Sequence, residues 1–253
     1  MNNKGLLLVG ALLLVTVGVL FSYYNFMRPV KVVEIKDDPL SVLNADEQGN
    51  FVENTTWYET KITYPKNSQL VSDKIFASYK NFETETGIKN YTTDAEARAG
   101  LAINVPELKY SYYAKYKLAT STNTVTYVYQ IYTFTGGAHE GTAIVPVTIN
   151  DKLEEVPVEL ILPSNKLEKV SQLVRADLTA QKRERLKSFG MTEKELDEFL
   201  SNDTFLEDGI KPTRDNYNAV WLEGENIVIA FQQYQVGPYV EGIYFVKIPK
   251  NQI

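Results

Sequence analysis

The sequence predicts an α+β protein: an N-terminal transmembrane helix, then an antiparallel tyrosine-rich meander and a closing hairpin, packed with helices. Two patterns predict this class. Residues 109–150 contain three consecutive segments in which apolar and polar side chains alternate, as in strands that bury one face. Helical spacing of apolar residues occurs in separate blocks before and after these segments, so strands and helices do not alternate one by one.

Composition bounds the kind of protein. A chain of 253 residues is long enough to bury a real core, as one large domain or two small ones. It has no cysteine, which excludes disulfides, thiol catalysis and thiolate metal sites. Its formal net charge of −6 disfavours nucleic-acid binding and favours cationic partners.

The N-terminal stretch has the pattern of a membrane anchor. No charged residue occurs in residues 5–21, and residues 5–27 are long enough as a helix to cross ~30 Å of hydrocarbon. A cleaved secretory signal is the alternative, but residues 21–25 are bulky where cleavage needs small side chains. We therefore expect an uncleaved single-pass anchor in the cell membrane. Residues 1–4 would form a cytoplasmic tail and the folded part would lie outside the cytoplasm.

The first elements after the anchor lead up to the sheet. Residues 28–50 show little periodicity, contain chain breakers such as Gly49, and are predicted to be a linker. The pattern then predicts a strand over Thr56–Tyr64 and a helix over Val71–Thr86, which Gly87 ends. The meander strands are predicted over Lys109–Leu118, Thr124–Phe134 and Thr142–Asn150. Together these elements make a strand-helix-meander subdomain, residues 51–160.

The second predicted subdomain, residues 161–253, combines a helical pair with the closing hairpin. A long helix is predicted from Ser164 or Asn165 to Ser188, and its charge-rich run 182–185 is interpreted as a solvated face. A second helix begins at Thr192, where Thr192 and Glu195 match a capping box. The remaining segments are an irregular stretch over 202–214 and strands over 219–222, 227–234 and 242–249.

Two unusual loops are the candidate functional features. The first, residues 134–142, holds Gly136, Gly137 and the chain's single histidine, His139. The second follows the strand 227–234 and contains a Pro-Tyr pair. Glycines let the backbone turn sharply, and loops between strands present groups to partners. We expect the two loops to meet at one rim of the sheet as a docking surface, with the two glycines and His139 structuring the first loop.

The second loop supplies the candidate contact residues Pro238, Tyr239, Tyr234 and Gly237. A tyrosine at the tip of a proline-stiffened loop loses little conformational entropy on binding, and exposed tyrosines are frequent binding anchors. The simpler interpretation is a turn that only reverses the chain between two strands.

His139 and two glutamates are the candidates for catalysis or metal binding. A single histidine without cysteine gives no metal-ligand spacing, so we predict neither metal nor cofactor and assign His139 to ordering its loop. Glu140 and Glu241 would form a glycosidase-like carboxylate pair if the loops met. Solvated loop carboxylates are the default interpretation for both.

Two motifs carry a resemblance to a known family. Residues 134–139 (F-T-G-G-A-H) resemble the T-G-G-A-H signature of the RsiV-like extracytoplasmic domain. Residues 228–242 resemble the terminal aromatic strand of that family, with its Tyr-x-x-x-Pro-Tyr-x-x-Gly motif. The order of the predicted elements also matches over residues 56–249. The resemblance implies a PdaC N-terminal-like subdomain over residues 51–160 and an RsiV C-terminal-like subdomain over residues 161–253.

The resemblance implies a binding domain. Founding members are membrane-anchored anti-sigma factors whose outer domain binds lysozyme, with the Pro-Tyr loop at the cleft of the enzyme. A related domain lies beside the catalytic module of PdaC-like peptidoglycan deacetylases and carries no catalytic residues. By this resemblance Pro238 and Tyr239 would contact the partner, and Tyr234 and Gly237 would shape the loop. Residues 1–4 are too few to hold a sigma factor, so sigma-factor regulation is not expected here.

The sequence therefore favours a non-catalytic, extracytoplasmic binding or sensor domain rather than an enzyme. Its expected partner is a cationic protein such as lysozyme, or peptidoglycan fragments. Two alternatives stay open: a hydrolase of cell-wall polymer that uses Glu140 and Glu241, and a structural protein of the cell envelope.

Overall fold

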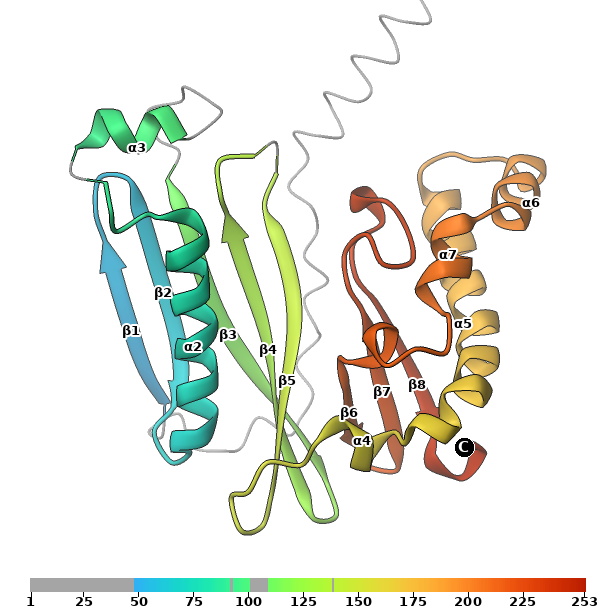
Figure 1. The fold of residues 1–253 in the computed structure, drawn as a ribbon. Helices are drawn as coiled ribbons and strands as arrows, with labels where there is room; N and C mark the ends of the chain where they lie inside the picture. The colour runs from blue at the N-terminus through green and yellow to red at the C-terminus, as the bar shows by residue number, and fades with distance from the viewer. Residues whose placement is uncertain (1–47, 92, 101–108, 138) are drawn as a thin grey trace, which may run out of the picture. The chain divides into compact units, whose positions relative to one another are not determined.

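The computed structural model describes residues 48–91, 93–100, 109–137 and 139–253, which belong to one compact unit (Figure 1). The predicted tail, the anchor over residues 5–27 and most of the linker lie outside the described residues. Among the helices of the described part, none is long and apolar enough to cross a membrane. The fold contains two sheets with helices packed on them, which confirms the α+β class.

The first sheet has five strands among the described residues, in the order β1-β2-β3-β4-β5. They are β1 (Gln48–Asn54), β2 (Tyr58–Pro65), β3 (Tyr110–Ser121), β4 (Thr124–Phe134) and β5 (Gly141–Asn150). The predicted meander is confirmed, because β3 pairs with β4 and β4 with β5, both antiparallel. The parallel pairing of β2 with β3 was not predicted.

Strand β1 corrects the predicted linker, which was wrong for residues 48–50. Gln48 pairs with Pro65 and Gly49 with Tyr64, so the pairing with β2 extends to the first described residue. A Cβ at Gly49 would lie 2.3 Å from the ring of Tyr64. The glycine that looked like a chain breaker instead lets an aromatic side chain cross the strand.

Helix α2 (Gln69–Thr86) covers one face of this sheet (Figure 1). Its apolar residues at helical spacing, among them Val71, Ile75 and Tyr79, pack against alternate residues of the strands. Gly87 ends the helix in the left-handed conformation, with φ 62°, as predicted. A short helix, α3 (Asp94–Gly100), follows.

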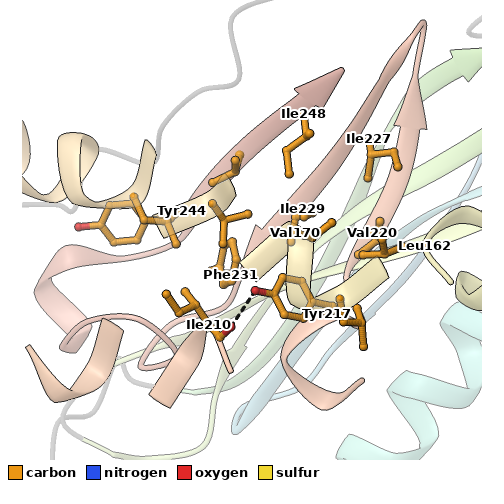
Figure 2. Packing of buried hydrophobic residues seen from close by; sticks show 14 of the residues in the cluster. Leu162, Val170, Ile210, Tyr217, Val220, Ile227, Ile229, Phe231, Tyr244 and Ile248 are labelled. Atoms are coloured by element: carbon orange, nitrogen blue, oxygen red, sulfur yellow. Dashed lines mark hydrogen bonds between the residues drawn. The ribbon is translucent and has the colours of Figure 1, made fainter. Parts of the chain in front are cut away.

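The second sheet has the order β6-β7-β8 and packs against the long helix α5 (Leu167–Ser188). Its strands are β6 (Val220–Glu223), β7 (Asn226–Phe231) and β8 (Tyr244–Pro249). Figure 2 shows the core between them, where the hydroxyl of Tyr217 donates to the carbonyl of Ile210 at 2.9 Å. Two short elements, α4 (Val158–Ile161) and η2 (Ser164–Lys166), lead into α5.

Two short helices and one 3-10 turn connect α5 to the second sheet. Helix α6 (Glu193–Ser201) begins with the predicted capping box of Thr192 and Glu195. The irregular stretch predicted over residues 202–214 was wrong, because it contains α7 (Thr204–Gly209), whose first turn Asp203 caps by accepting from the amide of Leu206. Six residues are too few to show helical periodicity. The turn η3 (Asp215–Tyr217) follows.

The two sheets contact each other through a third apolar cluster. Ala119, Val128 and Ile144 of the first sheet pack against Trp221, Val228 and Ala230 of the second. The amide of Gly224 also donates to the carbonyl of Thr120 at 2.8 Å. Because this contact holds the two sheets together, it also sets where the loops of one sheet lie relative to the loops of the other. The predicted subdomain boundary after residue 160 stays a prediction.

Candidate functional site

The β4–β5 loop and the β7–β8 loop meet in the structure. The ring of His139 stacks on that of Tyr239, with centroids 3.7 Å apart and planes at 20°. The hydroxyl of Tyr234 lies 2.8 Å from Nε2 of His139. The rings of Tyr234 and Tyr239 are 5.9 Å apart. The contact between the two loops that the sequence predicted is therefore present, and we call His139, Tyr234, Pro238, Tyr239 and Val240 the two-loop surface.

His139 is exposed, and its two ring nitrogens have separate partners. Nδ1 lies 3.3 Å from the carbonyl oxygen of Glu140, and Nε2 faces Tyr234. One arrangement of protons satisfies both contacts: Tyr234 donates to Nε2, and Nδ1–H donates to the carbonyl. Within the described residues no group of three or more carboxylate or histidine side chains is suited to hold a metal ion. The contacts of His139 are those of a residue that joins two loops.

Tyr234 and Tyr239 differ in exposure. Half of the surface of Tyr234 is exposed (50%), as is that of Val240 (55%), whereas Tyr239 is half-buried. Burial, followed by the nearby Glu140 carboxylate, raises the pKa of the Tyr239 hydroxyl. Tyr234 has a φ of 64°, in the left-handed region that costs a residue with a Cβ about 1–2 kcal/mol. Strain at an exposed ring is typical of positions held in place by their surroundings.

Glutamine side chains fasten the second loop to the first sheet. The side-chain amide of Gln232 accepts from the backbone N–H of Ile144 at 2.9 Å and donates to the backbone carbonyl of Ile144 at 2.8 Å. A neighbouring strand would make the same pair of hydrogen bonds. Gln233 accepts from the N–H of Thr142 at 2.8 Å. All three bonds use backbone groups of β5, the end strand of its sheet. Sequence reasoning missed these roles, although amides directly after a strand were a visible signal.

Gln235 holds the same loop from the other side. Its side-chain oxygen accepts from the backbone N–H of Gln232 at 2.9 Å, and its Nε2 donates to the backbone carbonyl of Asn216 at 2.9 Å. A Cβ at Gly209 would lie 2.1 Å from the carbonyl oxygen of Gln235, so the end of α7 packs directly on the loop backbone. The loop is thus held by α7, η3 and β5.

A buried ion-pair cluster lies beneath the second loop and corrects two predictions. Lys182, predicted to be solvated, is fully buried, and so is Glu241. Nζ of Lys182 lies 2.7 Å from Oε2 of Glu241, 2.9 Å from Oδ2 of Asp203 and 2.5 Å from the carbonyl oxygen of Val236. The hydroxyl of Tyr244 donates to the same Oε2 at 2.6 Å. We call Lys182, Asp203, Glu241 and the Val236 carbonyl the Lys182 cluster.

The glycines of the two loops have different requirements. At Gly237 a Cβ would lie 2.5 Å from Oε2 of Glu241 and 2.9 Å from Nζ of Lys182, so the backbone passes directly over the cluster. Gly136 has a φ of 89°, which favours glycine. At Gly137 the nearest atom to an added Cβ would be 4.0 Å away, and nothing in the geometry requires glycine there. Pro238, with φ −65°, precedes the 3-10 turn η4 (Tyr239–Glu241).

The geometry does not place Glu140 and Glu241 as a catalytic pair. A glycosidase needs both carboxylates facing the substrate. Glu140 is exposed, but the carboxylate of Glu241 is buried and paired with Lys182. The expectation that Glu241 is a solvated loop residue was therefore wrong, and the burial of its carboxylate does not favour a role in a surface reaction centre.

Comparisons with known proteins match the two parts of the chain separately. The family described as a protein of unknown function, DUF3298, matches residues 159–251. The family described as deacetylase PdaC matches residues 51–142. The N-terminal part of the described chain thus resembles PdaC, and the C-terminal part resembles DUF3298. The predicted PdaC resemblance is thereby confirmed, whereas the RsiV-like resemblance stays a prediction.

A solved structure shows a related fold. A DUF3298 family member from Bacteroides fragilis superposes with a TM-score of 0.55 at 20% sequence identity, covering 81% of this chain and 89% of that one. A DUF3298 family protein from Pseudomonas aeruginosa gives a TM-score of 0.43 at 14% identity, with coverages of 81% and 89%. No curated protein matches the chain. At such identities the first likeness shows the fold alone.

Proposed function

We propose that this chain is a membrane-anchored, extracytoplasmic binding or sensor domain that docks its ligand on the two-loop surface without catalysis. The observation that supports the proposal most directly is the stack of His139 on Tyr239, with Tyr234 bonded to the same imidazole. Three rings from two loops form one partly exposed aromatic cluster. Tyrosine is enriched among the residues that contribute most to binding at protein interfaces.

The second loop is ordered before any ligand arrives, which favours docking. Gln232, Gln233 and Gln235 fasten it to the surrounding elements, and the Lys182 cluster supports it from below. A preordered loop loses little conformational entropy on binding. Tyr234 and Val240 keep about half of their surface exposed, so contact area is left for a partner.

The proposed ligand is a cationic envelope protein of the lysozyme class, with peptidoglycan fragments as the second ligand to be tested. The net charge of −6 favours a basic partner, and oppositely charged proteins associate faster at low salt. The resemblance of residues 134–139 and 228–242 to lysozyme-binding domains supports the same class. A hydrolase using Glu140 and Glu241 receives no support, because Lys182 occupies the carboxylate of Glu241.

Titration of the purified 253-residue chain in mild detergent with lysozyme, and separately with soluble peptidoglycan fragments, tests the proposal. Tyr239→Ala is expected to weaken lysozyme binding at least tenfold. Leu160→Ala is the matched control, because it removes an exposed apolar side chain on α4, at the opposite end of the fold (Figure 1). Raising salt is expected to slow association.

Three outcomes would contradict the proposal. Equal binding by wild type and Tyr239→Ala would remove the two-loop surface from the docking site. Turnover of peptidoglycan that disappears in a Glu140→Gln, Glu241→Gln variant would establish the hydrolase. Failure to bind either ligand would leave the structural role in the envelope as the better account.

A further inference from the structure

We propose that the Lys182 cluster is a latch that holds the second loop in its docking conformation, which makes Lys182 a positioning residue of the two-loop surface. The expected effect of the latch on binding rests on the proposed function. Its effect on the conformation of the loop can be tested without any ligand. Lys182 lies on α5, beneath the loop, and is fully buried. It therefore acts through the loop backbone and through Glu241.

One ammonium group holds both ends of the loop segment that carries Tyr239. At the start of the segment, the Val236 carbonyl accepts from Nζ of Lys182 at 2.5 Å. At its end, Oε2 of Glu241 lies 2.7 Å from the same nitrogen. Between them, the amide of Glu241 donates to the carbonyl of Pro238 at 2.9 Å and closes the turn. The position of Tyr239 thus depends on both contacts of Lys182.

Of the two carboxylates in the cluster, that of Glu241 on the loop has fewer contacts with the helices of the fold. Asp203 is tied into the rigid part of the fold, because its side chain caps α7 through the amide of Leu206 at 3.1 Å. Glu241 belongs to a three-residue 3-10 turn in a loop. Without the ammonium, two buried carboxylates would face each other with no cation between them. Movement of Glu241 into water relieves this repulsion, and in the proposed latch this movement carries Tyr239 away from His139.

Tyr244 is the second tether of Glu241. Its hydroxyl donates to Oε2, and burial, followed by the bond to Glu241, raises the pKa of this hydroxyl, so it stays a donor at neutral pH. Arg185 lies over the Tyr244 ring, 4.0 Å from its centroid, and donates weakly to the carbonyl of Ile243. Among the described residues, the ion pairs formed by Glu241 involve Lys182 alone. Oε1 of Glu241 is buried and has no hydrogen-bond partner among the residues that the structure describes.

The single histidine of the chain provides a readout that needs no ligand. A ring stacked at 3.7 Å shifts the proton resonances of the imidazole upfield through its ring current. The His139 Hε1 and Hδ2 signals of the full chain in detergent therefore report whether the stack on Tyr239 is intact. Lys182→Met and Glu241→Ala are expected to move both signals toward the positions of a free imidazole.

Two variants separate the latch from general damage. Glu241→Gln keeps an acceptor for Lys182 and Tyr244 and leaves one ammonium facing one carboxylate, so it is expected to retain the stack. Lys187→Met removes a lysine from the same helix, but one that is exposed and paired with Glu193 at the surface, so the signals should not move. Should Lys182→Met fail to fold, Glu241→Ala against Glu241→Gln decides the question, because neither leaves two carboxylates facing each other without a cation.

Binding kinetics give the second readout. Opening the latch reduces the fraction of molecules whose loop is ready to bind, and the apparent Kd rises by the inverse of that fraction. Glu241→Ala is expected to slow lysozyme association about tenfold while dissociation of the bound complex changes little. Tyr239→Ala removes a contact itself and is expected to speed dissociation.

The outcomes are distinguishable. Unchanged His139 signals in folded Lys182→Met and Glu241→Ala would overturn the latch, whatever happens to binding. A lost stack with unchanged lysozyme binding would leave the latch standing as a structural device, and would overturn both its role in docking and the proposed docking surface. A lost stack in Lys187→Met would show that any change on α5 disturbs the loop, which would also overturn the specific role of Lys182.

Discussion

The imidazole of His139 lies nearly parallel to the ring of Tyr239, with the ring centroids 3.7 Å apart. The two residues come from loops of different sheets: His139 follows β4 in the first sheet, and Tyr239 follows β7 in the second. Their contact therefore depends on the apolar cluster that joins the sheets and on the glutamines that bond the second loop to β5. The candidate site is a product of how the two sheets pack.

The bond between Tyr234 and His139 is expected to add a small, measurable coupling. Tyr234→Phe removes only the hydroxyl and should lower the free energy of unfolding by about 0.5–1.5 kcal/mol, the usual value for one hydrogen bond. In a His139→Ala background the same substitution should cost less, because the partner is gone. Urea unfolding of the wild type, the two single variants and the double variant measures this double-mutant cycle. Equal costs in both backgrounds would show that the hydrogen bond contributes nothing.

Gly237→Ala is expected to destabilise the protein by about 1–3 kcal/mol, as overpacking of a tight site does. The added methyl would meet the carboxylate of Glu241 and the ammonium of Lys182 within 3 Å, and both are held in place. Gly137→Ala is the matched control from the other loop, because the nearest described atom beyond its chain neighbours would lie 4.0 Å from the added Cβ. Thermal unfolding of both variants checks the prediction. A larger loss for Gly137→Ala would contradict it.

Gln232→Ala should lower the free energy of unfolding by about 1–3 kcal/mol, because it leaves the buried N–H and C=O of Ile144 without their partner. Gln172→Ala removes an exposed amide that donates a hydrogen bond to its helical neighbour Glu168, and it should change stability by less than about 0.5 kcal/mol. Chemical denaturation of the two variants provides the test. Similar losses would mean that the bonds to β5 do not stabilise the fold.

The protein is expected to lose stability in alkaline solution between pH 10 and 12. Burial raises the pKa of Tyr112 to about 12 and that of Tyr217 to about 12, from 10.0. The folded state therefore keeps these protons above pH 10, where the unfolded chain has released them, and unfolding becomes more favourable as pH rises. Below pH 10 this contribution is fully present, and above about 12 it is lost.

Tyr112→Phe checks the origin of the alkaline effect, because it removes one of the buried hydroxyls with a raised pKa. The free energy of unfolding, measured from pH 9 to 12, should fall less steeply in this variant than in the wild type. A wild-type value that stays constant over this range would refute the assignment.

Much of the secondary structure was predictable from local sequence. The alternating tyrosine-rich segments predicted β3, β4 and β5, since strands with one buried face alternate apolar and polar side chains. Gly87 and the Thr192–Glu195 capping box marked helix ends, because the backbone groups at these ends need specific local partners. The two glycine-bearing loops were also recognisable, because their glycines, the single histidine and the Pro-Tyr pair are visible in the local sequence.

Other features were decided only by contacts between distant parts of the chain. Gly49 looked like a breaker until Tyr64 packed across it, and Lys182 looked solvated until Asp203 and Glu241 enclosed it. The strand-like bonds of Gln232 likewise require β5 beside it. By itself the sequence determined the periodic elements, their ends and the residues of the two loops, because these depend on neighbours along the chain. The tertiary structure decided which charges are buried, which edges are closed and how His139 reaches Tyr239, because the burial of a side chain depends on the whole surface packed around it.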